Sequence, residues 1–590
     1  MSMESAHGYA STEIPQTRLW VVLLALALVF YCLGLGGQYV PTNGDELVYI
    51  HIARLTAESG HWLPLVSDLP NMRNTKPPLL FWQAIVAGDW GTHWSLFALR
   101  LPSLIYTFLT TALVAWTVHG ITRDMRRALM SACVYLAFFS TYRYGRPYLT
   151  SAPETFWLAL PMFALLWIGY RKEPAARESG VSVITPFSTG FLLFAGIAWG
   201  LGSAYKSFAL IAPAAAALWC AQVLTGKTLQ IKFLLVTSVQ VGFSVVVAVG
   251  IFGLWFAVDP DPAAVWREFV IGENVGKMGD KLGYWHEAVF GGGSSMWAQT
   301  LSFVENAGLL AFAIIGLAVI AFRSRTAFRY WPPHAPVLTA WLLVWALVFM
   351  LPSQRSARYV IPAMPALAIV LSLWWQYIPR AWFLASGLLI TLACFAMARI
   401  TWVMAEVQIA SPAEALLTAF VLAAAIALVV AGVAKPAWTR ACTVAACLVF
   451  YGGFGLTVAP LDGPQGRYNG TVMTALKGKS IAVPSNFNAQ WERFEFLLPG
   501  NHIAPFDMAA MTAGDTPGRA TLDGLLQRND VVVWGQAEIG QSQPPCRPSC
   551  RVLAERWVVK ERHKSSDITS ANLWFLSWLF AREWIVTSKP

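Results

Sequence analysis

Two charged residues near the start of the chain are the first candidates for chemistry. Asp45 stands in the stretch Asn-Gly-Asp-Glu-Leu-Val-Tyr, and Lys76 stands in Asn-Thr-Lys-Pro-Pro. A carboxylate can act as general base for a hydroxyl group, or its charge can position a substrate. A lysine can bind a phosphate group and stabilise negative charge that develops on it. The two residues together predict a site for a phosphate-linked substrate.

The residues around Asp45 predict a short helix that begins there. Asn43 and Glu46 have the spacing of a capping box, in which both side chains bind the backbone at the helix start. This explains Glu46 but not Asp45, which falls in the first turn, where the helix dipole keeps a carboxylate ionised. Tyr49 follows four residues later on the same helix face. We expect the helix to end at Glu-Ser-Gly, residues 58–60.

Lys76 is expected on a stiff segment. The two prolines after it disfavour a helix before Pro77 and favour extended backbone. Between the predicted helix and Lys76, the stretches His-Trp-Leu-Pro-Leu and Ser-Asp-Leu-Pro-Asn predict an extended hairpin. The chain becomes apolar again directly after Lys76, so an anion and a cation are returned to one membrane face.

Composition predicts a polytopic α-helical membrane protein. The 590 residues are 56% hydrophobic and 13% charged, with a mean hydropathy of +0.52, whereas a soluble protein carries about 25% charged residues. About thirteen apolar segments approach the length of a membrane span. We expect the first to be a retained helix, not a removed signal peptide. The segments are 19–36, 98–119, 127–142, 154–170, 187–205, 207–224, 232–256, 305–322, 336–352, 360–378, 382–403, 413–434 and 440–459.

Basic residues predict the orientation of these segments. If the N-terminus is cytoplasmic, every inside loop is basic, as the positive-inside rule requires. An odd number of spans then places the first loop, 37–97, and everything after residue 460 on the outer side. The basic inside loops contain residues 123–127, 171–177, 227–232, 323–329, 380 and 435–440.

The last part of the chain, residues 461–590, predicts a separate soluble α/β domain, after a transmembrane domain over residues 1–460. Its strand-like runs are Ser-Ile-Ala-Val-Pro-Ser, Asp-Val-Val-Val-Trp-Gly and Ala-Glu-Arg-Trp-Val-Val-Lys-Glu. Cys546 and Cys550 suit a disulfide in an oxidising compartment. A zinc site is disfavoured there because no second cysteine or histidine pair is near. The other six cysteines fall in or beside apolar segments and are interpreted as packing residues.

The net charge of +10 does not indicate nucleic acid, because the inside loops account for most of it. The informative cations are those in outside loops, which the topology rule does not explain. They favour an anionic partner such as a phosphate or pyrophosphate lipid, although contact with membrane headgroups explains any one of them equally well. They are Arg73, Lys76, Arg143, Arg146, Arg267, Lys277, Lys281, Arg355 and Arg358.

Four stretches resemble a known family. The first loop, Gly-Asp-Glu-Leu-Val-Tyr through Thr-Lys-Pro-Pro-Leu-Leu-Phe-Trp, resembles that of the polyprenyl-phosphate-sugar glycosyltransferases of the GT-C superfamily. These include protein O-mannosyltransferases and bacterial lipid A aminoarabinose transferases. Similar, more weakly, are Gly-Ser-Ala-Tyr-Lys-Ser around Lys206 and the outer loop Val-Ile-Gly-Glu-Asn-Val-Gly-Lys. The stretch Ala-Arg-Tyr-Val-Ile-Pro around Tyr359 is a more specific match.

The resemblance implies roles for individual residues. Asp45 matches the catalytic aspartate, and Glu154 falls where relatives have a second acidic residue. Lys76 matches the lysine that binds the lipid phosphate. The remaining positions implied in substrate binding are Lys206, Lys277, Arg358 and Tyr359. Tyr49 is added to them because it shares the helix face of Asp45.

Metal dependence is left open by one departure from the family pattern. The aminoarabinose transferases commonly have Glu before Lys-Pro-Pro, whereas this chain has Thr75. The change removes a carboxylate implicated in metal binding, so a divalent metal is possible but weakened. His286 alone does not replace it, because a lone histidine in a loop is more often a hydrogen-bonding residue. No other cofactor is implied.

The resemblance implies an inverting glycosyltransferase in a bacterial inner membrane, with its site facing the periplasm. The donor would be a sugar on polyprenyl phosphate, either aminoarabinose or another sugar such as a hexosamine. The favoured acceptor is lipid A or lipopolysaccharide, and protein hydroxyls are the alternative. A flippase or transporter is a third reading, but such proteins place charges within helices near the bilayer midplane. An envelope scaffold is disfavoured because it does not need Asp45 and Lys76 on one face.

Overall fold

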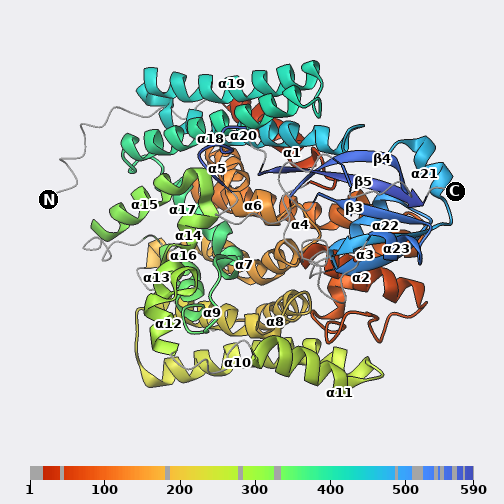
Figure 1. The fold of residues 1–590 in the computed structure, drawn as a ribbon. Helices are drawn as coiled ribbons and strands as arrows, with labels where there is room; N and C mark the ends of the chain where they lie inside the picture. Colours follow the sequence, from red (N-terminus) through yellow and green to blue (C-terminus); the bar gives the residue numbers. More distant parts are fainter. Residues whose placement is uncertain are drawn as a thin grey trace.

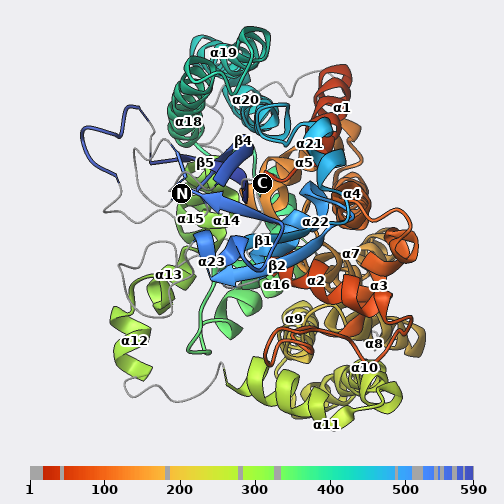
Figure 2. The ribbon, with the colours of Figure 1, turned by 45° about the vertical axis from the view of Figure 1, so that its right-hand side comes forward.

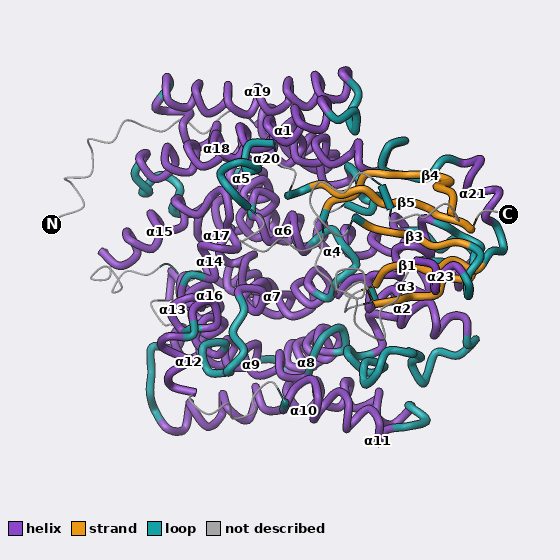
Figure 3. The backbone as a smooth tube through the Cα atoms, in the orientation of Figure 1, coloured by secondary structure: helices purple, strands orange, loops and turns teal. Residues whose placement is uncertain are grey.

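The chain is mostly helical, with a small sheet at one end of the molecule (Figures 1 and 3). The computed structural model describes most of the sequence in segments separated by short gaps. The described residues are 17–39, 45–179, 187–276, 284–323, 332, 334–485, 489–507, 522–536, 543–544, 550–560, 568–575 and 578–588, with no side chains for 169–179.

Eight helical stretches of the described chain are long and apolar enough to cross a membrane. Such helices satisfy every backbone polar group internally, which the hydrocarbon core demands. They contain α4 (Leu96–Thr122), α7 (Ser151–Ser179), α9 (Ile211–Gly226), α10 (Ile231–Val258), α14 and α15 (Ser302–Ala307 and Ala311–Arg323), α18 (Arg380–Glu406), α19 (Pro412–Ala434) and α20 (Thr439–Val458).

Shorter helices account for the other predicted apolar segments. The segment predicted over 127–142 is broken at Phe138, where the backbone is extended (φ −69°, ψ 135°). Every predicted apolar segment therefore lies on a helix. Helix length alone does not determine how many of these helices cross the membrane. The shorter helices are α1 (Thr17–Cys32), α5 (Met125–Ala137), α6 (Phe139–Tyr144), α8 (Thr189–Ser203), α16 (Ala335–Val348), η8 (Ala357–Ala363) and α17 (Met364–Leu373).

The first loop contains the predicted helix, α2 (Asp45–Glu58), and a second one, α3 (Pro78–Ala87). Pro77 is extended (φ −63°, ψ 158°) and α3 begins directly after it, as the Lys-Pro-Pro sequence predicts. The hairpin predicted between the two helices is wrong. Residues 61–77 form bends and turns, and within this fully described stretch no two strands pair.

The five-stranded sheet has the order β2-β1-β3-β5-β4 and contains all three predicted strand runs. β1 (Ser480–Ser485) pairs in parallel with β2 (His502–Asp507) and β3 (Val531–Gly535), whereas β5 (Phe580–Ser588) pairs antiparallel with β3 and β4 (Cys550–Val559). Cys550 is in a disulfide, and its predicted partner, Cys546, lies outside the described residues. Short helices α21 (Gly470–Leu476), α22 (Arg493–Leu497) and α23 (Leu522–Leu526) accompany the strands.

The sheet packs against the first loop. Both views place α2 and α3 beside it (Figures 1 and 2). A single hydrophobic cluster contains Val48 and Ile50 of α2, Leu80 and Phe81 of α3, and Ile481, Val483, Val531, Val533 and Ile585 of the sheet. Removal of this much apolar surface from water is the main force that fixes the sheet on the loop.

Glu46 makes contacts that the predicted cap does not include. Arg100 of α4 donates from Nε and Nη2 to both oxygens of the Glu46 carboxylate, at 2.8 and 2.9 Å. The backbone N–H of Tyr148 donates to the same carboxylate at 2.8 Å. Glu46 is 1% exposed and Arg100 2% exposed, so α2 is joined to a membrane helix by a buried ion pair. The predicted cap partner, Asn43, lies outside the described residues.

The segment after α10 contains α11 (Pro262–Val265) and the π-helix η4 (Trp266–Val275), and later α12 (Tyr284–Phe290) and α13 (Met296–Thr300). π-helical turns are rare and occur frequently at functional sites. Phe269 of η4 packs in a cluster with Phe252 and Trp255 of α10. This packing fixes η4 beside the end of a membrane helix, close to the first loop.

Candidate active site

Six of the predicted site residues line one cavity of about 220 Å³. They come from α2, from the segment before α3, from the break between α8 and α9, and from η8. Side chains from η4 and from the start of α7 complete the wall. The six are Asp45, Tyr49, Lys76, Lys206, Arg358 and Tyr359.

Lys76 is held by groups from three directions. Its Nζ donates to the backbone carbonyl of Thr75 at 2.7 Å and lies 3.3 Å from Oε2 of Glu273 in η4. It also lies 5.7 Å from the centre of the Tyr49 ring, within the range of a cation–π contact. The charge of Lys76 is therefore directed into the cavity by neighbours that fix its position.

Lys206 repeats this arrangement on another wall. It lies in the break between α8 and the short 3-10 helix at Phe208–Leu210. Its Nζ is 2.8 Å from Oε1 of Glu154 and 5.6 Å from the centre of the Tyr359 ring. Glu154 is completely buried, and its other oxygen, Oε2, lacks a hydrogen bond among the residues described. Glu154 thus stands behind Lys206 and is coupled to the cavity through it.

Asp45 and Arg358 form the third ion pair. Nη1 of Arg358 lies 3.1 Å from Oδ2 of Asp45, although 313 residues separate them in sequence. Both side chains are more than a third exposed, and both line the cavity. The guanidinium of Arg358 therefore holds the Asp45 side chain at the cavity wall, where a carboxylate can accept a proton or position a cationic centre.

Tyr49 can be assigned its protonation state. Burial raises the pKa of its phenol well above the ordinary value, and the negative charge of Asp45 raises that pKa further. The side chain is 5% exposed. Tyr49 is therefore a neutral hydroxyl at physiological pH, suited to packing and hydrogen bonding and not to proton abstraction.

Sequence reasoning gave no site role to Glu273 and Thr75, two further residues that line this cavity. Glu273 stands in the stretch Val-Ile-Gly-Glu-Asn-Val-Gly-Lys, of which only Lys277 is a predicted binding residue. Thr75 was noted only as the loss of a carboxylate, yet it is 4% exposed and its hydroxyl lacks a hydrogen bond within the described structure. Thr75 could have been found from the sequence because it directly precedes Lys76, the predicted phosphate-binding lysine. For Glu273 the signal was an acid in a loop with otherwise unexplained cations.

A second cavity, of about 130 Å³, adjoins the first. The two share Thr75, Lys76, Lys206, Glu273 and Tyr359 as lining residues. The rest of the second cavity is largely apolar, with Ala209, Leu210, Phe269, Phe349 and Pro352. Lys76 and Lys206 thus stand at the junction between the larger, polar cavity and the smaller, largely apolar one.

Two further positions that the sequence raised are not among the described lining residues of this cavity. Lys277 lies outside the described residues, and His286 is an exposed residue of α12. In the described part of the chain, no three His, Cys, Asp or Glu side chains gather as a metal site would require. Metal dependence therefore stays a question for the experiment.

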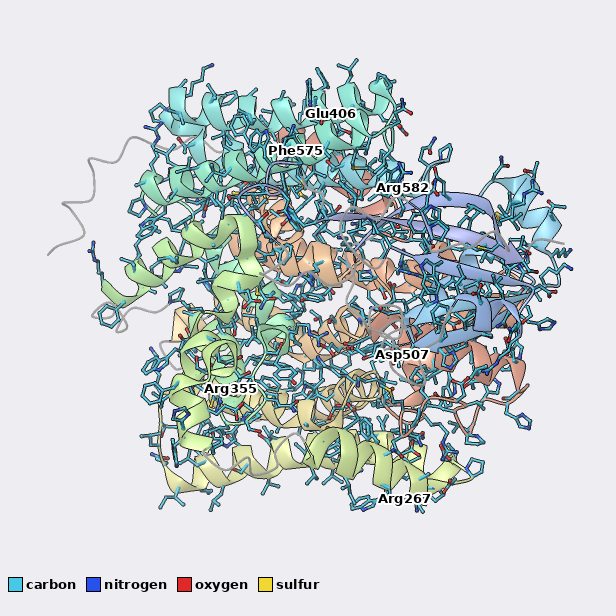
Figure 4. All side chains as sticks on the ribbon, viewed as in Figure 1. Arg267, Arg355, Glu406, Asp507, Phe575 and Arg582 are labelled. Carbon is cyan, nitrogen blue, oxygen red and sulfur yellow. The ribbon has the colours of Figure 1, made fainter. Side chains whose placement is uncertain are left out.

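The cations that the sequence analysis expects in outside loops have different surroundings in the structure. Arg358 reaches the cavity, whereas Arg267 is exposed at the lower edge of the molecule (Figure 4). Arg355 is 6% exposed and donates to the carbonyls of Met350 and Ser294. Arg146 is 1% exposed and donates to the carbonyls of Tyr31 and Leu33. Several cations that suggested a lipid phosphate therefore satisfy backbone groups instead.

Comparison with known proteins supports the resemblance. Residues 19–261 match the family described as dolichyl-phosphate-mannose-protein mannosyltransferase. The chain is 26% identical over 355 residues to the undecaprenyl phosphate-alpha-4-amino-4-deoxy-L-arabinose arabinosyl transferase of Pectobacterium carotovorum, and 27% identical over 360 residues to that of Pseudomonas savastanoi. These matches cover 60% of this chain, and 58% and 60% of the two relatives. The predicted resemblance is thereby confirmed.

The fold is that of a solved relative. Two crystal structures of ArnT from Cupriavidus metallidurans, one in the apo state and one bound to undecaprenyl phosphate, superpose with TM-scores of 0.54 and 0.52 at 15% identity. They cover 88% and 97% of this chain, and 93% and 98% of theirs. The helical region and the C-terminal sheet therefore follow one known architecture.

Proposed function

We propose that this chain is an inverting membrane glycosyltransferase that transfers a sugar from a polyprenyl phosphate carrier, such as undecaprenyl phosphate. The favoured sugar is aminoarabinose, with a hexosamine as the other amino-sugar choice. The favoured acceptor is lipid A or lipopolysaccharide. The curated relatives are named for an undecaprenyl phosphate-linked aminoarabinose, and the fold is shared with a protein crystallised with undecaprenyl phosphate.

One observation carries this proposal. Residues that the family resemblance selects at positions 45, 49, 76, 206, 358 and 359 meet around one cavity, although they belong to four separate parts of the sequence. Three cations converge there, each paired with a carboxylate. A phosphate bound among them gains charge-assisted hydrogen bonds, and the adjoining apolar cavity suits the first part of a prenyl chain.

The cations stabilise the leaving group in this mechanism. Glycosyl transfer develops positive charge on the sugar carbon and negative charge on the departing phosphate. Lys76 and Lys206 stand at the junction of the two cavities, and there they balance the negative charge that develops on the departing phosphate. Tyr49 and Tyr359 hold the lysines in position through their rings.

The acceptor is assigned to Asp45. It accepts the proton of an attacking hydroxyl, or it positions an acceptor phosphate that is already ionised. Arg358 orients Asp45 through their ion pair. Attack from the face opposite the departing phosphate inverts the anomeric carbon. Glu154, which lies behind Lys206, acts as a positioning residue in place of the second catalytic acid expected from the sequence.

The proposal includes a topology. Residues 1–460 form the transferase domain, with thirteen crossings, and residues 461–590 form a soluble domain on the periplasmic side of the bacterial inner membrane. The basic inside loops support this orientation. So does the cluster that packs the sheet against the first loop, because both must then lie on the same side. A divalent metal is left out of the mechanism because Thr75 stands where the family has a carboxylate.

A protein hydroxyl is the second candidate acceptor. It is favoured by the family match over residues 19–261, since that family is described by protein mannosylation. The donor phosphate, the cations and Asp45 would act in the same way on a serine or threonine hydroxyl. The two candidates therefore differ in the acceptor alone.

Reconstitution tests the proposal. Purified protein in lipid nanodiscs is incubated with undecaprenyl phosphate-4-amino-4-deoxy-L-arabinose and either lipid A or a serine-rich peptide, and products are identified by mass spectrometry. The proposal predicts transfer to lipid A with release of undecaprenyl phosphate. Transfer to the peptide alone would select the second candidate. The same protein is also reconstituted in closed vesicles, where movement of the donor across the membrane without transfer to either acceptor would identify a flippase and refute the enzyme.

A further inference from the structure

We infer that Glu273 selects the sugar of the donor by binding a positively charged amine on it. This inference rests on the proposed transfer from polyprenyl phosphate and adds a residue that discriminates between sugars. In the structure Glu273 is paired with Lys76 at 3.3 Å. When the donor enters, the two exchange partners: Lys76 takes the phosphate and Glu273 takes the ammonium group of the sugar.

The pair between Lys76 and Glu273 is built to exchange. Charge-assisted N–H···O bonds are typically about 2.7–2.9 Å long, so a separation of 3.3 Å is loose. The Glu273 side chain is 30% exposed. By contrast, the pair of Lys206 with Glu154 is 2.8 Å long and its carboxylate is completely buried. Opening the buried pair would leave a charge without solvent or partner, whereas opening the looser pair costs much less.

Location separates Glu273 from the other exposed carboxylate. Asp45 lines only the larger cavity, whereas Glu273 lines both. A donor with its phosphate at Lys76 must place its sugar beside that junction. Glu273 is thus a neighbour of the sugar, while Asp45 remains directed to the acceptor.

Thr75 marks the same place as a ligand position. It lines both cavities, is 4% exposed, and its hydroxyl lacks a hydrogen-bond partner within the described residues. A buried hydroxyl without a partner is costly and needs an explanation. A polar group of a bound sugar or phosphate supplies the missing bond.

Charge decides which sugar fits. A phosphodiester carries one negative charge and a sugar ammonium one positive charge, so an amino-sugar headgroup is a zwitterion that matches the opened pair. A neutral sugar offers the Glu273 carboxylate no positive charge in place of the one that Lys76 gives to the donor phosphate. Like charges repel, so the site rejects the neutral sugar as well as attracting the amine.

Two donors that differ in one group test the inference. Full-length protein in nanodiscs is titrated with undecaprenyl phosphate-4-amino-4-deoxy-L-arabinose and with undecaprenyl phosphate-L-arabinose, which has a hydroxyl in place of the amine. We expect the wild type to prefer the amine in both Kd and kcat/KM by at least tenfold, as expected for hydrogen bonds to charged groups. Glu273→Gln should abolish this preference, weakening the amine donor while the neutral donor binds equally or more tightly. Glu273→Asp should retain most of it.

Glu268→Gln is the matched control. Glu268 lies on the same π-helix, and its carboxylate accepts hydrogen bonds from the backbone and side chain of Asn74. Loss of its charge should affect both donors equally. The inference is overturned if the wild type shows no preference, or if Glu273→Gln weakens both donors to the same degree. Transfer of both donors at equal rates would refute the inference alone, whereas absence of binding and transfer with both would refute the proposed function with it.

Discussion

Each lysine of the cavity is fixed by one carboxylate and one aromatic ring. Lys76 contacts Glu273 and Tyr49, and Lys206 contacts Glu154 and Tyr359. A flexible lysine side chain loses up to about 2 kcal/mol of rotamer entropy when it is ordered. Because these contacts order the lysines before the donor binds, less of that cost falls on binding.

Lys76 is expected to be sensitive to substitution because it binds the departing phosphate. Lys76→Ala should lower the transfer rate by about tenfold to a thousandfold, on the scale of losing an oxyanion-stabilising donor, and should also weaken binding of undecaprenyl phosphate. Lys76→Arg should lose less because it keeps the charge. Rates from single-turnover transfer and Kd values from titration provide the measurement. Wild-type rate and affinity in Lys76→Ala would reduce Lys76 to an anchor at the membrane surface.

At this scale the sequence predicts residue types well and pairings poorly. Asp45, Lys76 and Lys206 were found because each stands in a motif. Glu273 was missed because its link to Lys76 joins residues 197 positions apart, and no local pattern reports such a contact. Glu46 was assigned to a cap because its spacing from Asn43 fits one. In the structure its carboxylate accepts a hydrogen bond from Arg100 of another helix.

Helix α2 is the element on which the site depends. It presents Asp45 and Tyr49 to the cavity, while Glu46 joins it to α4 and its apolar residues join it to the sheet. A site on an element held from two sides keeps its geometry better than a site on a free loop.

Loss of the buried pair should therefore release α2. Glu46→Gln removes the charge that balances Arg100, and a broken buried pair costs about 3–5 kcal/mol because one charge remains uncompensated. We expect a clearly lower Tm in nanodiscs, followed by loss of transfer near that temperature. Glu58→Gln is the control, since its exposed pair with Arg54 lies one turn apart on the same helix and is worth about 0.5 kcal/mol. Equal thermal stability of the two variants would show that α2 is held by apolar packing alone.

Helices that consist of a long apolar segment were predicted correctly. Local bends of the backbone were not predicted. The membrane helices follow from hydropathy. The break at Phe138 does not, because the sequence across it stays apolar. The segment 61–77 suggested strands through its prolines, yet its backbone is fixed by packing, with Leu65 completely buried, so tertiary contacts override the local pattern.

The sheet and the membrane domain are joined by charge as well as by apolar packing. Nδ1 of His51 on α2 lies 2.9 Å from Glu492, and Nε2 lies 2.6 Å from Asp68. Arg54 binds Glu492 as well, at 2.6 Å. Glu492 belongs to the C-terminal domain and is completely buried, so this cluster fixes that domain above the first loop.

The cluster predicts a pH dependence of the docked domain. Burial lowers the pKa of His51, but its bonds and charge interactions with Glu492 and Asp68 outweigh burial, and the pKa lies above its ordinary value of 6.5. A raised pKa in the folded state contributes stability that is complete below the unfolded value, and it is lost as pH rises through the folded value. Docking should therefore weaken above about pH 6.5.

Hydrogen exchange measures this effect. Amides of α2 and of residues 489–497 should exchange faster, after correction for the intrinsic rate, as pH is raised from about 6 to about 9. His51→Gln removes the titrating group, so its protection should be lower at pH 6 and nearly independent of pH. Wild-type protection that is constant across this range, or that increases with pH, would contradict the assigned charge on His51.

At the scale of the whole molecule, the sequence predicts a membrane region followed by a domain with strands, and the structure has long apolar helices followed by a five-stranded sheet. It does not predict that the sheet covers the first loop, because the hydrophobic cluster draws residues from 48 to 585. Orientation was inferred from Lys and Arg in the loops. This orientation remains a prediction. A reporter that is active only in the cytoplasm, fused after residue 588, tests it and is expected to stay silent.

The central claim is that the cavity around Asp45 performs the transfer, and Asp45→Asn tests it most directly. Asn preserves the shape and the helix-start hydrogen bonding of Asp, so the variant should insert, fold and bind undecaprenyl phosphate as the wild type does. Loss of the charge should slow transfer to lipid A at least about a hundredfold, on the scale of losing a general base. Near-normal single-turnover transfer by a folded Asp45→Asn protein would contradict the account and exclude this carboxylate from the reaction.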